Sequence, residues 1–532
     1  MPTITIDGQS VTVADGATIL DAARQAGIEI PTLCYRAGMR PPTSCMVCVV
    51  RVHGIDRLLP SCGTRVHHGM VVESETDEVR AARRSALELL LSDHAGDCLG
   101  PCQLACPAGM NIPLMIRQVI AGDVAGASRT VRERIALPSV LGRICPAPCE
   151  APCRRASLDQ PIAIRLLKRW VGDADLARGE CWRPEPAAPT GKRVAIVGAG
   201  PAGLAAAWRL AADGHAVVML DERQGPGGGM REVSPARLPP DVLAAEVQAI
   251  LDLGVDLHMG LRVGRDVALE ELRREFDAVL LAVGEADAET ADELGLDLDR
   301  RGLRADRATH QSPVPYVFVA GSALSPSKMA VRALASGHRA AEAISQVLAG
   351  EEARPAGRPF SVSMGRLSRE EAALMAADAS DRPRTQPAGG EAVGLNDEEA
   401  VREGLRCLNC DCRGLDKCLL RAHAIACGAK TGVFTGARRP FERDLTHPEI
   451  IYESGKCIAC GLCVQVAEQY REELGLTFIG RGFTVRTAVP FSRCLAAGLK
   501  RAAHECAQAC PTGAIVLRDA EEPRAEEAGG DA

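Results

Sequence analysis

The chain has 532 residues, 46% of them hydrophobic and 25% charged, with a formal net charge of −7. This length suits three or four domains with sizeable cores. No segment approaches the roughly 18 apolar residues of a membrane span, no signal peptide precedes the first element, and no Lys/Arg cluster would track phosphates. We therefore expect a cytoplasmic protein that neither spans a membrane nor binds nucleic acid.

The 22 cysteines form four groups, and the long stretch between the second and third groups holds only Cys181. In a reducing compartment thiols stay reduced, and grouped cysteines usually bind metal. We therefore expect metal sites rather than disulfides.

The first element is a predicted hairpin around Asp7-Gly8, because apolar and polar residues alternate on either side. A short helix should follow, with Thr18 as N-cap and Gly27 at its end. A C-x10-C-x2-C-x13-C pattern then predicts a [2Fe-2S] cluster, since zinc sites usually have two C-x2-C knuckles and this group has one. Its ligands would be Cys34, Cys45, Cys48 and Cys62. This region resembles the N-terminal ferredoxin domain of the large peripheral-arm subunit of respiratory complex I, shared with iron-only hydrogenases and NAD-linked formate dehydrogenases.

The second group begins with "DHAGDCLGPCQLACP", in which a histidine and three cysteines recur every fourth position. "LLLSDHAGDC" resembles the complex I region where a histidine and three cysteines hold a [4Fe-4S] cluster. The following "CPAGMNIPLMIRQVIAGDVAGA", "LPSVLGRICPAPCEAPCRR" and "IAIRLLKRW" resemble the helical double-[4Fe-4S] domain of the glutamate synthase small subunit and dihydropyrimidine dehydrogenase. That resemblance implies one cluster on His94, Cys98, Cys102 and Cys153. It implies a second cluster on Cys106, Cys145 and Cys149 with an oxygen ligand.

Two residues depart from that family's pattern. His94 stands where the family has cysteine; a neutral imidazole is a good iron ligand, and a purely structural histidine is the alternative. Lys168 stands where the family has Glu or Gln, and an ammonium has no lone pair to donate. A water, Gln160 or no fourth protein ligand are the open options there.

The cysteine-poor middle contains "GKRVAIVGAGPAGLAAAWRLAADGHAVVMLDE", which reads as strand, glycine-rich turn, helix and second strand. Its glycines suit a tight turn, a close approach to a pyrophosphate and close helix–strand packing, and the acid after the second strand suits a ribose hydroxyl. This segment also resembles the glutamate synthase small subunit, which implies FAD rather than the alternative, NAD. The candidate cofactor-binding residues are Gly198, Gly200, Pro201, Ala202, Gly203, Asp221, Gly321 and Ser322.

A nicotinamide domain is expected to be missing. In the resembling family a second Rossmann domain separates the equivalent of "LLAVG", here ending at Gly284, from the returning segment, here beginning at Pro315. The intervening residues are about as many as a single βαβ unit needs and contain no second Gly-x-Gly. Ser322 also stands where the family places an aspartate against the flavin's ribityl chain, so a vacant flavin site is a further alternative.

The last groups predict more clusters. "RCLNCDCRGLDKC" could hold a [4Fe-4S] cluster or zinc, and its spacing leaves both open; its cysteines are Cys407, Cys410, Cys412 and Cys418. "GKCIACGLC" is a ferredoxin turn whose local fourth position is Ala467, so a remote cysteine should complete the [4Fe-4S] site. The expected ligands are Cys457, Cys460, Cys463 and Cys510, with Cys506 as a weaker candidate. Cys181, Cys427 and Cys494 are expected to be ordinary buried thiols.

We expect a multidomain α+β and α/β protein. Its predicted parts are a β-grasp [2Fe-2S] ferredoxin domain at 1–78, a helical [4Fe-4S] domain at 79–185, a Rossmann-like FAD domain without a second nicotinamide domain at 190–350, a linker at 351–400, a C-terminal ferredoxin-like iron–sulfur domain at 401–518 and an acidic tail at 519–532.

No catalytic dyad, open substrate metal site or G-x-S-x-G elbow is present. The sequence therefore predicts an electron-transfer subunit with about 14 irons, or about 18 if the Cys407 group also holds iron. Its partners would be other subunits of an oxidoreductase, including one that handles NAD(P)H or resembles ferredoxin. A self-sufficient NAD(P)H-dependent flavoenzyme and a scaffold with an empty flavin fold are the alternatives.

Overall fold

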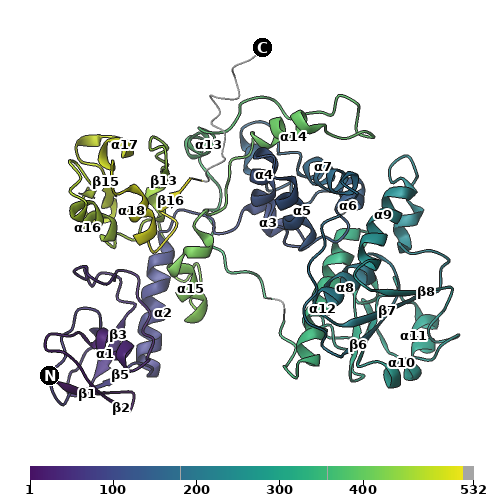
Figure 1. Cartoon of the computed structure of the whole chain (residues 1–532), viewed down its shortest axis with the longest axis horizontal. Helices are drawn as coiled ribbons and strands as arrows, with labels where there is room; N and C mark the ends of the chain where they lie inside the picture. The colour runs from purple at the N-terminus through teal and green to yellow at the C-terminus, as the bar shows by residue number, and fades with distance from the viewer. Residues whose placement is uncertain (180, 356, 519–532) are drawn as a thin grey trace. The chain divides into compact units, whose positions relative to one another are not determined.

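The computed structural model describes residues 1–179, 181–355 and 357–518, and the predicted acidic tail at 519–532 lies outside them. The chain forms two compact units, each assembled from separate segments (Figure 1). Among the described residues, unit 1 contains Met1–Leu99, Pro359–Ala377 and residues 410–518. Unit 2 contains Gly100–Arg358 and Asp378–Asn409. In the described residues no helix is both long and apolar enough to cross a bilayer.

Unit 1 begins with a mixed five-stranded sheet in the order β2-β1-β5-β3-β4. Its strands are β1 Thr3–Ile6, β2 Gln9–Thr12, β3 Val49–Val52, β4 Leu59–Pro60 and β5 Val71–Glu73. The turn between β1 and β2 uses Asp7 and Gly8, with φ of 47° and 83°. Helix α1, Ile19–Gln25, starts at a capping box in which Thr18 and Asp21 satisfy each other's backbone N–H. The hairpin and the helix therefore lie where the sequence predicts them.

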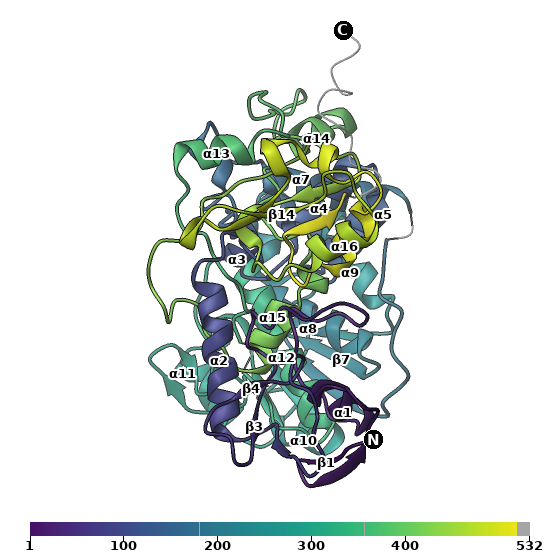
Figure 2. The ribbon, with the colours of Figure 1, turned by 90° about the vertical axis from the view of Figure 1, so that its left-hand side faces the viewer.

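The rest of unit 1 packs around a second apolar core. Helix α2, Asp77–Ser92, lies beside α15, Leu419–Ala426, although more than 300 residues separate them (Figure 2). The C-terminal part joins two antiparallel strand pairs with short helices. These are β13 Ile450–Tyr452 with β16 Ile515–Leu517, β14 Thr477–Ile479 with β15 Arg486–Ala488, α16 Leu462–Gln469, α17 Leu495–Gly498 and α18 Ala503–Ala509.

Unit 2 combines a helical part with a parallel sheet in the order β12-β9-β6-β7-β8 (Figure 1). The strands are β6 Arg193–Val197, β7 Ala216–Asp221, β8 Asp256–Met259, β9 Ala278–Leu281 and β12 Val317–Val319. The helices are α3 Pro101–Ala105, α4 Ile112–Ile120, α5 Val124–Arg132, α6 Pro138–Ile144, α7 Ile164–Ala177, α8 Pro201–Ala212, α9 Pro240–Leu251, α10 Leu269–Glu275 and α12 Ala330–Leu348.

The two faces of the parallel sheet bury alternate residues of each strand, as the two-residue period of a strand requires. Val194 and Ile196 of β6 face the core that contains α8 and α12, whereas Ala195 and Val197 face the core that contains α10. The first core continues without a break through the helical part of unit 2. The predicted domain boundary between 185 and 190 is thus not a boundary in the hydrophobic core.

Residues 285–314 do not form a second nucleotide-binding domain. They contain helix α11, Ala288–Leu294, and a small antiparallel pair of β10, Leu298–Asp299, with β11, Gly302–Leu303. Within the described ranges, the sheet that contains β6 is the only sheet in which all strands are parallel.

The predicted linker at 351–400 is divided between the two units. Its first part includes α13, Arg369–Met375, in unit 1, and its second part leads into α14, Asp397–Gly404, in unit 2. Its proline, glycine and charged residues suggested a linker, and most of its charged side chains are exposed, but Glu399 is buried, as are Glu403 and Arg406 just beyond it.

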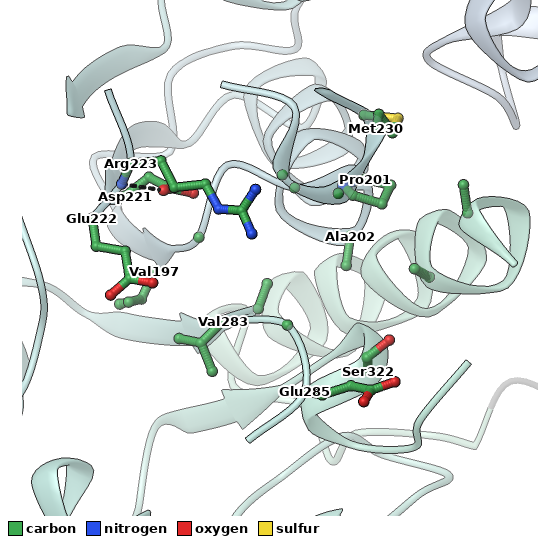
Figure 3. A pocket seen from close by; sticks show the side chains of 18 of the residues that line it. Val197, Pro201, Ala202, Asp221, Glu222, Arg223, Met230, Val283, Glu285 and Ser322 are labelled. Carbon is green, nitrogen blue, oxygen red and sulfur yellow. Dashed lines mark hydrogen bonds between the residues drawn. The ribbon is translucent and has the colours of Figure 1, made fainter. Parts of the chain in front are cut away.

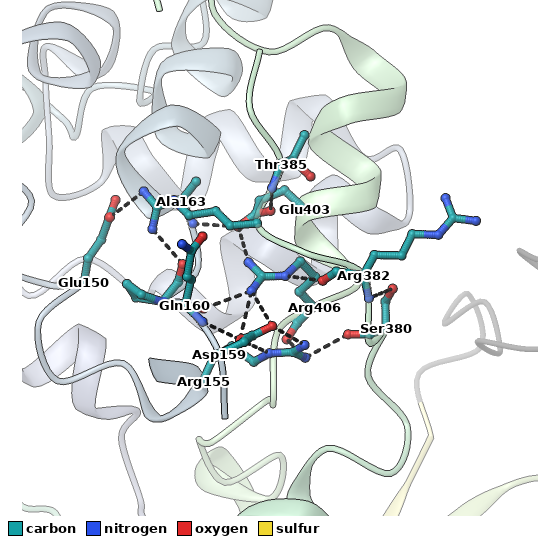
Figure 4. A network of polar contacts seen from close by, with 12 residues as sticks. Glu150, Arg155, Asp159, Gln160, Ala163, Ser380, Arg382, Thr385, Glu403 and Arg406 are labelled. Atoms are coloured by element: carbon teal, nitrogen blue, oxygen red, sulfur yellow. Dashed lines mark hydrogen bonds and ion pairs between the residues drawn. The ribbon is translucent and has the colours of Figure 1, made fainter. Parts of the chain in front are cut away.

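Arg406 and Glu403 are both fully buried, and they hold the second part of this segment on unit 2 (Figure 4). Arg406 donates to Glu403 at 2.8 Å and to Asp159 at 3.1 Å. Glu403 also accepts from the backbone N–H of Ala163 and of Thr385, at 2.8 and 2.7 Å. Buried charges are stable only when paired in this way.

Candidate functional site

The four cysteines of the first group lie together in unit 1, and all are buried. The sulfurs of Cys34 and Cys45 are 3.4 Å apart, and those of Cys48 and Cys62 are 3.3 Å apart. Hydrogen bonds from Cys45 and Cys62 hold the pKa of Cys34 far below its usual range, and Cys62 lowers that of Cys48 to about 7. Two pairs of neighbouring sulfurs suit two irons, each with two thiolate ligands from the chain.

The ferredoxin turn of unit 1 closes on a remote cysteine. Cys457, Cys460, Cys463 and Cys510 line one cavity beside Tyr452. Burial, together with the nearby thiols of Cys510 and Cys457, raises the pKa of Cys460 to about 12. Cys506 is not among the described residues that line this cavity. Its thiol is fully buried and donates to the carbonyl of Cys463 at 3.5 Å.

Three cysteines of the second group line a cavity in unit 2, and they are Cys106, Cys145 and Cys149. Lys168, which is 5% exposed, lines the same cavity. Burial raises the pKa of Cys149 to about 12, and the Lys168 ammonium opposes that shift. Gln160 is exposed and does not line this cavity. Lys168, rather than Gln160, therefore lies beside the three cysteines of this cavity.

The set implied for the other cluster of the second group is divided between the units: His94 and Cys98 belong to unit 1, whereas Cys102 and Cys153 belong to unit 2. The third group is divided as well, because Cys407 belongs to unit 2 and Cys410, Cys412 and Cys418 to unit 1.

His94 has a low proton affinity. Burial, together with the charges of Lys456 and Arg439, lowers its pKa to about 4. The imidazole is therefore neutral at pH 7, as a ligand to iron must be.

In the parts of the chain that the structure describes, no three His, Cys, Asp or Glu side chains are arranged as ligands of a single ion. The ligands of a cubane bind four separate irons, so convergence on one point is not expected of them.

A cavity of about 910 Å³ lies at the carboxyl ends of β6 and β9 in unit 2 (Figure 3). Gly198, Gly200, Pro201 and Ala202 form one wall, where β6 turns into α8. This is the crevice in which open α/β sheets bind nucleotides, with a helix N-terminus toward the phosphates.

The glycines of the turn are required by close contacts. A Cβ on Gly198, whose φ is +108°, would lie 2.3 Å from the Ala282 carbonyl oxygen. A Cβ on Gly203 would lie 1.9 Å from the carbonyl oxygen of Gly198, which keeps α8 close to β6. The geometry thus agrees with the roles that the spacing assigns to these glycines.

Asp221 ends β7 and holds the same turn. Its carboxylate accepts from the backbone N–H of Ala199 at 2.6 Å and from that of Arg223 at 2.8 Å. A carboxylate has about four acceptor positions, so these bonds leave room for a ribose hydroxyl. The neighbouring Glu222 also lines the cavity, as Figure 3 shows.

The returning segment closes the other side of the cavity. Gly321, with φ of +69°, lies so close to α8 that an added Cβ would be 2.8 Å from the Cβ of Ala202. Ser322 lines the cavity, and its hydroxyl donates to the carbonyl of Ser327 at 3.3 Å. Val283 and Glu285 follow β9 on the same side (Figure 3).

Sequence reasoning missed two glycines of this site. Gly228, with φ of +53°, approaches Gly200 so closely that its Cβ would be 2.9 Å from the Gly200 Cα, and Gly337 lets α12 contact α8 at the Ala202 carbonyl. The run "GPGGGM" could have indicated a close backbone approach at Gly228. Gly337 is a lone glycine inside a helix, and its sequence context gave no such signal.

The three cysteines expected to be ordinary buried thiols differ in exposure. Cys181 and Cys427 are partly buried, but Cys494 is exposed because it sits at the N-cap of the short helix α17.

Three domain families match the chain. Residues 1–77 match a 2Fe-2S iron–sulfur cluster binding domain. Residues 82–180 match dihydropyrimidine dehydrogenase domain II, a 4Fe-4S cluster domain. Residues 196–264 match an NAD(P)-binding Rossmann-like domain.

Curated relatives are similar over about a third of the chain. The NADP(+)-dependent formate dehydrogenase subunit beta of Moorella thermoacetica is 42% identical over 206 residues, which are 35% of this chain and 29% of that protein. The NADPH-Fe(3+) oxidoreductase subunit beta of Geobacter sulfurreducens is 38% identical over 207 residues, 38% of this chain and 30% of that protein.

The NAD-dependent dihydropyrimidine dehydrogenase subunit PreT of Escherichia coli is 38% identical over 223 residues, 40% of this chain and 53% of that protein. The alignments thus span between a third and about half of the relatives' lengths. The chain is a homologue of oxidoreductase subunits that combines a 2Fe-2S domain, a 4Fe-4S domain of the dihydropyrimidine dehydrogenase type and an NAD(P)-binding Rossmann-like domain.

Proposed function

We propose that this chain is the electron-transfer iron–sulfur flavoprotein subunit of a multi-subunit oxidoreductase. The observation that carries the proposal is that one chain contains several buried groups of thiols and a glycine-lined dinucleotide cavity. Thiolates are the ligands of iron–sulfur clusters, and such clusters pass single electrons. The [2Fe-2S] cluster would bind Cys34, Cys45, Cys48 and Cys62, and a [4Fe-4S] cluster would bind Cys457, Cys460, Cys463 and Cys510.

FAD is the proposed occupant of the cavity in unit 2. The backbone at Gly198 and Gly200 has no side chain that would block a pyrophosphate, and the N-terminus of α8 favours its negative charge. Asp221 would accept from a ribose hydroxyl there. Bound FAD would exchange electrons in pairs on one side and singly on the other.

A partner is proposed to handle NAD(P)H. Residues 285–314 form only α11 and a short strand pair, so this chain offers one nucleotide-binding sheet in its described ranges. If FAD fills that sheet's cavity, a nicotinamide must bind to another chain. Formate dehydrogenase, hydrogenase and NADH dehydrogenase-like assemblies are the settings we favour, and the cytoplasmic location remains a prediction.

A further [4Fe-4S] cluster is proposed on Cys106, Cys145 and Cys149. Lys168 lines the same cavity, but its charged ammonium has no lone pair for iron. This cluster would therefore have three thiolate ligands from the chain, with a nearby cation that opposes the negative charge of the thiolates.

Anaerobic purification of the full-length protein tests this function. We expect about 14 irons per chain, or about 18 if the Cys407 group also holds iron, one FAD released by acid, and no dye reduction by NADPH until a co-purifying subunit is added. About two irons per chain would overturn the cluster assignments. Acid release of NAD instead of FAD would overturn the flavin assignment.

The same experiment separates the alternatives. Dye reduction by NADPH with the isolated chain would favour a self-sufficient flavoenzyme, for which the similarity to a subunit named NAD-dependent is the supporting observation. Absence of any acid-released nucleotide would favour a scaffold, for which Ser322 in the cavity is the supporting observation.

A further inference from the structure

The Cys98 backbone joins two segments that are distant in sequence, and all three belong to unit 1. The Cys98 N–H donates to the carbonyl of Val362 at 3.3 Å, and the Cys98 carbonyl accepts from the N–H of Cys412 at 3.2 Å. Cys98 and Cys412 are therefore neighbours, although more than 300 residues separate them in the sequence. Cys418 follows in the same loop as Cys412.

Two sulfurs of this group accept hydrogen bonds from backbone N–H groups, as thiolate ligands of iron–sulfur clusters do. The Cys98 sulfur accepts from the N–H of Val362, and the Cys418 sulfur accepts from the N–H of Arg421, both at 3.4 Å. Backbone amides that point at sulfur favour its ionised form. Gly513 makes room for the third sulfur, because a Cβ there would lie 2.2 Å from the sulfur of Cys412.

The three thiols also interact with one another. Cys412 and Cys98 are the two thiols whose charges act most strongly on Cys418, and Cys412 is the thiol whose charge acts most strongly on Cys98. One sulfur from the Cys98 segment and two from the loop that contains Cys412 and Cys418 are the kind of ligand set expected around a cubane.

His94 lies four residues before Cys98 and shares a neighbour, Lys456, with the thiols of Cys98 and Cys412. A Cβ on Gly96 would lie 3.2 Å from the Nε2 of His94 and 2.6 Å from the Cε of Lys456, so these two side chains flank the same glycine. Lys456 in turn interacts with the charge of Cys412 and pairs with Glu453. The buried cation would offset the negative charge of the thiolates.

We propose that His94, Cys98, Cys412 and Cys418 hold one [4Fe-4S] cluster in unit 1. This set differs from the two sets that the sequence motifs indicate, in which Cys98 joins Cys102 and Cys153, and Cys412 joins Cys407 and Cys410. It rests on the iron–sulfur chemistry of the proposed function but not on the flavin or on the partner.

Unit 2 is consistent with this division. Arg155 donates to the backbone carbonyl of Arg406 at 3.2 Å, so the segment after Cys153 is tied to the segment before Cys407. Cys102, Cys153 and Cys407 all pack against the core of unit 2. They would serve a separate cluster.

The new cluster would also be next to the ferredoxin-turn cluster. The N–H of Leu419, which follows Cys418, donates to the carbonyl of Pro511 at 2.9 Å, and Pro511 follows Cys510. The Cys510 thiol acts electrostatically on Cys418 as well. One hydrogen bond therefore connects the ligand loops of the two sites.

Paired substitutions in the anaerobically purified full-length protein test the ligand set. Cys98→Ser and Cys412→Ser should each remove about four irons and four sulfides, and the double variant should remove no more than either single variant. Cys98→Ser combined with Cys102→Ser should remove about eight. The sets indicated by the motifs predict the opposite for both doubles, and that result would overturn the proposal, as would retention of all iron by Cys412→Ser.

Cys494→Ser is the matched control, because this exposed cysteine belongs to no thiol group. Retention of the [2Fe-2S] EPR signal in each variant shows that unit 1 still folds. If a serine variant loses that signal, His94→Cys is tested in place of that variant. This variant should retain its iron. The reduction potential of one [4Fe-4S] cluster should fall, because a thiolate replaces an imidazole as ligand. Adding Cys412→Ser should then remove that shifted signal, and its survival would overturn the proposal. About two irons in the unsubstituted protein would instead refute the proposed function.

Discussion

Unit 1 and unit 2 each incorporate a segment from far along the chain, but they hold it by different means. In unit 2, residues 378–409 are held by buried ion pairs such as Arg406 with Glu403. In unit 1, residues 410–418 meet Cys98 through backbone bonds and a group of thiols. The ion pairs are complete within the protein, whereas thiols become strong connections only when they share a metal centre. The fold of unit 1 should therefore depend more on iron.

The largest effect is expected from removal of iron. Metal binding contributes directly to folding where the ligands come from separate segments. Hydrogen exchange at the N–H of Cys412 should then accelerate by at least about 100-fold, while the N–H of Thr385, bound to Glu403 in unit 2, should change by less than about tenfold. Equal acceleration at both amides would end the distinction between the units.

Arg406→Ala should act on unit 2 alone. It leaves Glu403 buried without its charged partner, a loss that typically costs about 3–5 kcal/mol. Urea unfolding followed by tryptophan fluorescence measures this, because Trp170, Trp182 and Trp208 are all in unit 2.

The control for Arg406→Ala is Arg402→Ala, because Arg402 lies in helix α14 just before Arg406 and is only partly buried. The control should change the free energy of unfolding by less than about 0.5 kcal/mol. A changed [2Fe-2S] spectrum in Arg406→Ala would contradict the assignment of its effect to unit 2.

Glu246→Gln should remove a pH dependence of the free energy of unfolding of unit 2. Burial raises the pKa of Glu246 from 4.5 to about 7, although Arg132 and the N–H groups of Val140 and Ser139 oppose this shift. The pKa of this carboxyl is higher in the folded than in the unfolded state. Its contribution to the free energy of unfolding is therefore complete below pH 4.5. As the pH rises from 4.5 to 7, the free energy of unfolding should fall by about 3 kcal/mol. Tryptophan-detected unfolding between pH 5.5 and 8 measures the slope.

In that experiment the exposed Asp241→Asn, on the same helix α9, should leave the slope as it is. An unchanged slope in Glu246→Gln would mean that another group sets the pH dependence of unit 2.

The smallest effect is expected from Ser322→Asp. An aspartate beside the cavity would offer a stronger acceptor to a ribityl hydroxyl, so FAD should dissociate about tenfold less readily, or about 1.4 kcal/mol. Flavin retention after ultrafiltration measures this. Ser325→Asp is the control, because Ser325 is exposed and does not line the cavity; equal effects of both variants would refute a contact with flavin.

Local spacing was sufficient where a site is built from one stretch of chain. Cys34 to Cys62 belong to a single small sheet domain, and Gly198 to Gly203 belong to one strand–turn–helix unit, so short sequence distances translate directly into short spatial distances. The Thr18 cap and the Asp7-Gly8 turn are local in the same way. Such features depend on backbone geometry over a few residues.

Only the tertiary structure decided which distant segments meet. Motif spacing grouped Cys98 with Cys102, but it gave no sign that Cys412, more than 300 residues further on, bonds to the Cys98 carbonyl. Likewise the charged, proline-rich stretch before Arg406 has the composition of a linker, yet residues 378–409 belong to unit 2, where Glu399, Glu403 and Arg406 are buried. Composition and spacing describe neighbours along the chain, whereas burial and charge pairing depend on what the rest of the fold brings into contact.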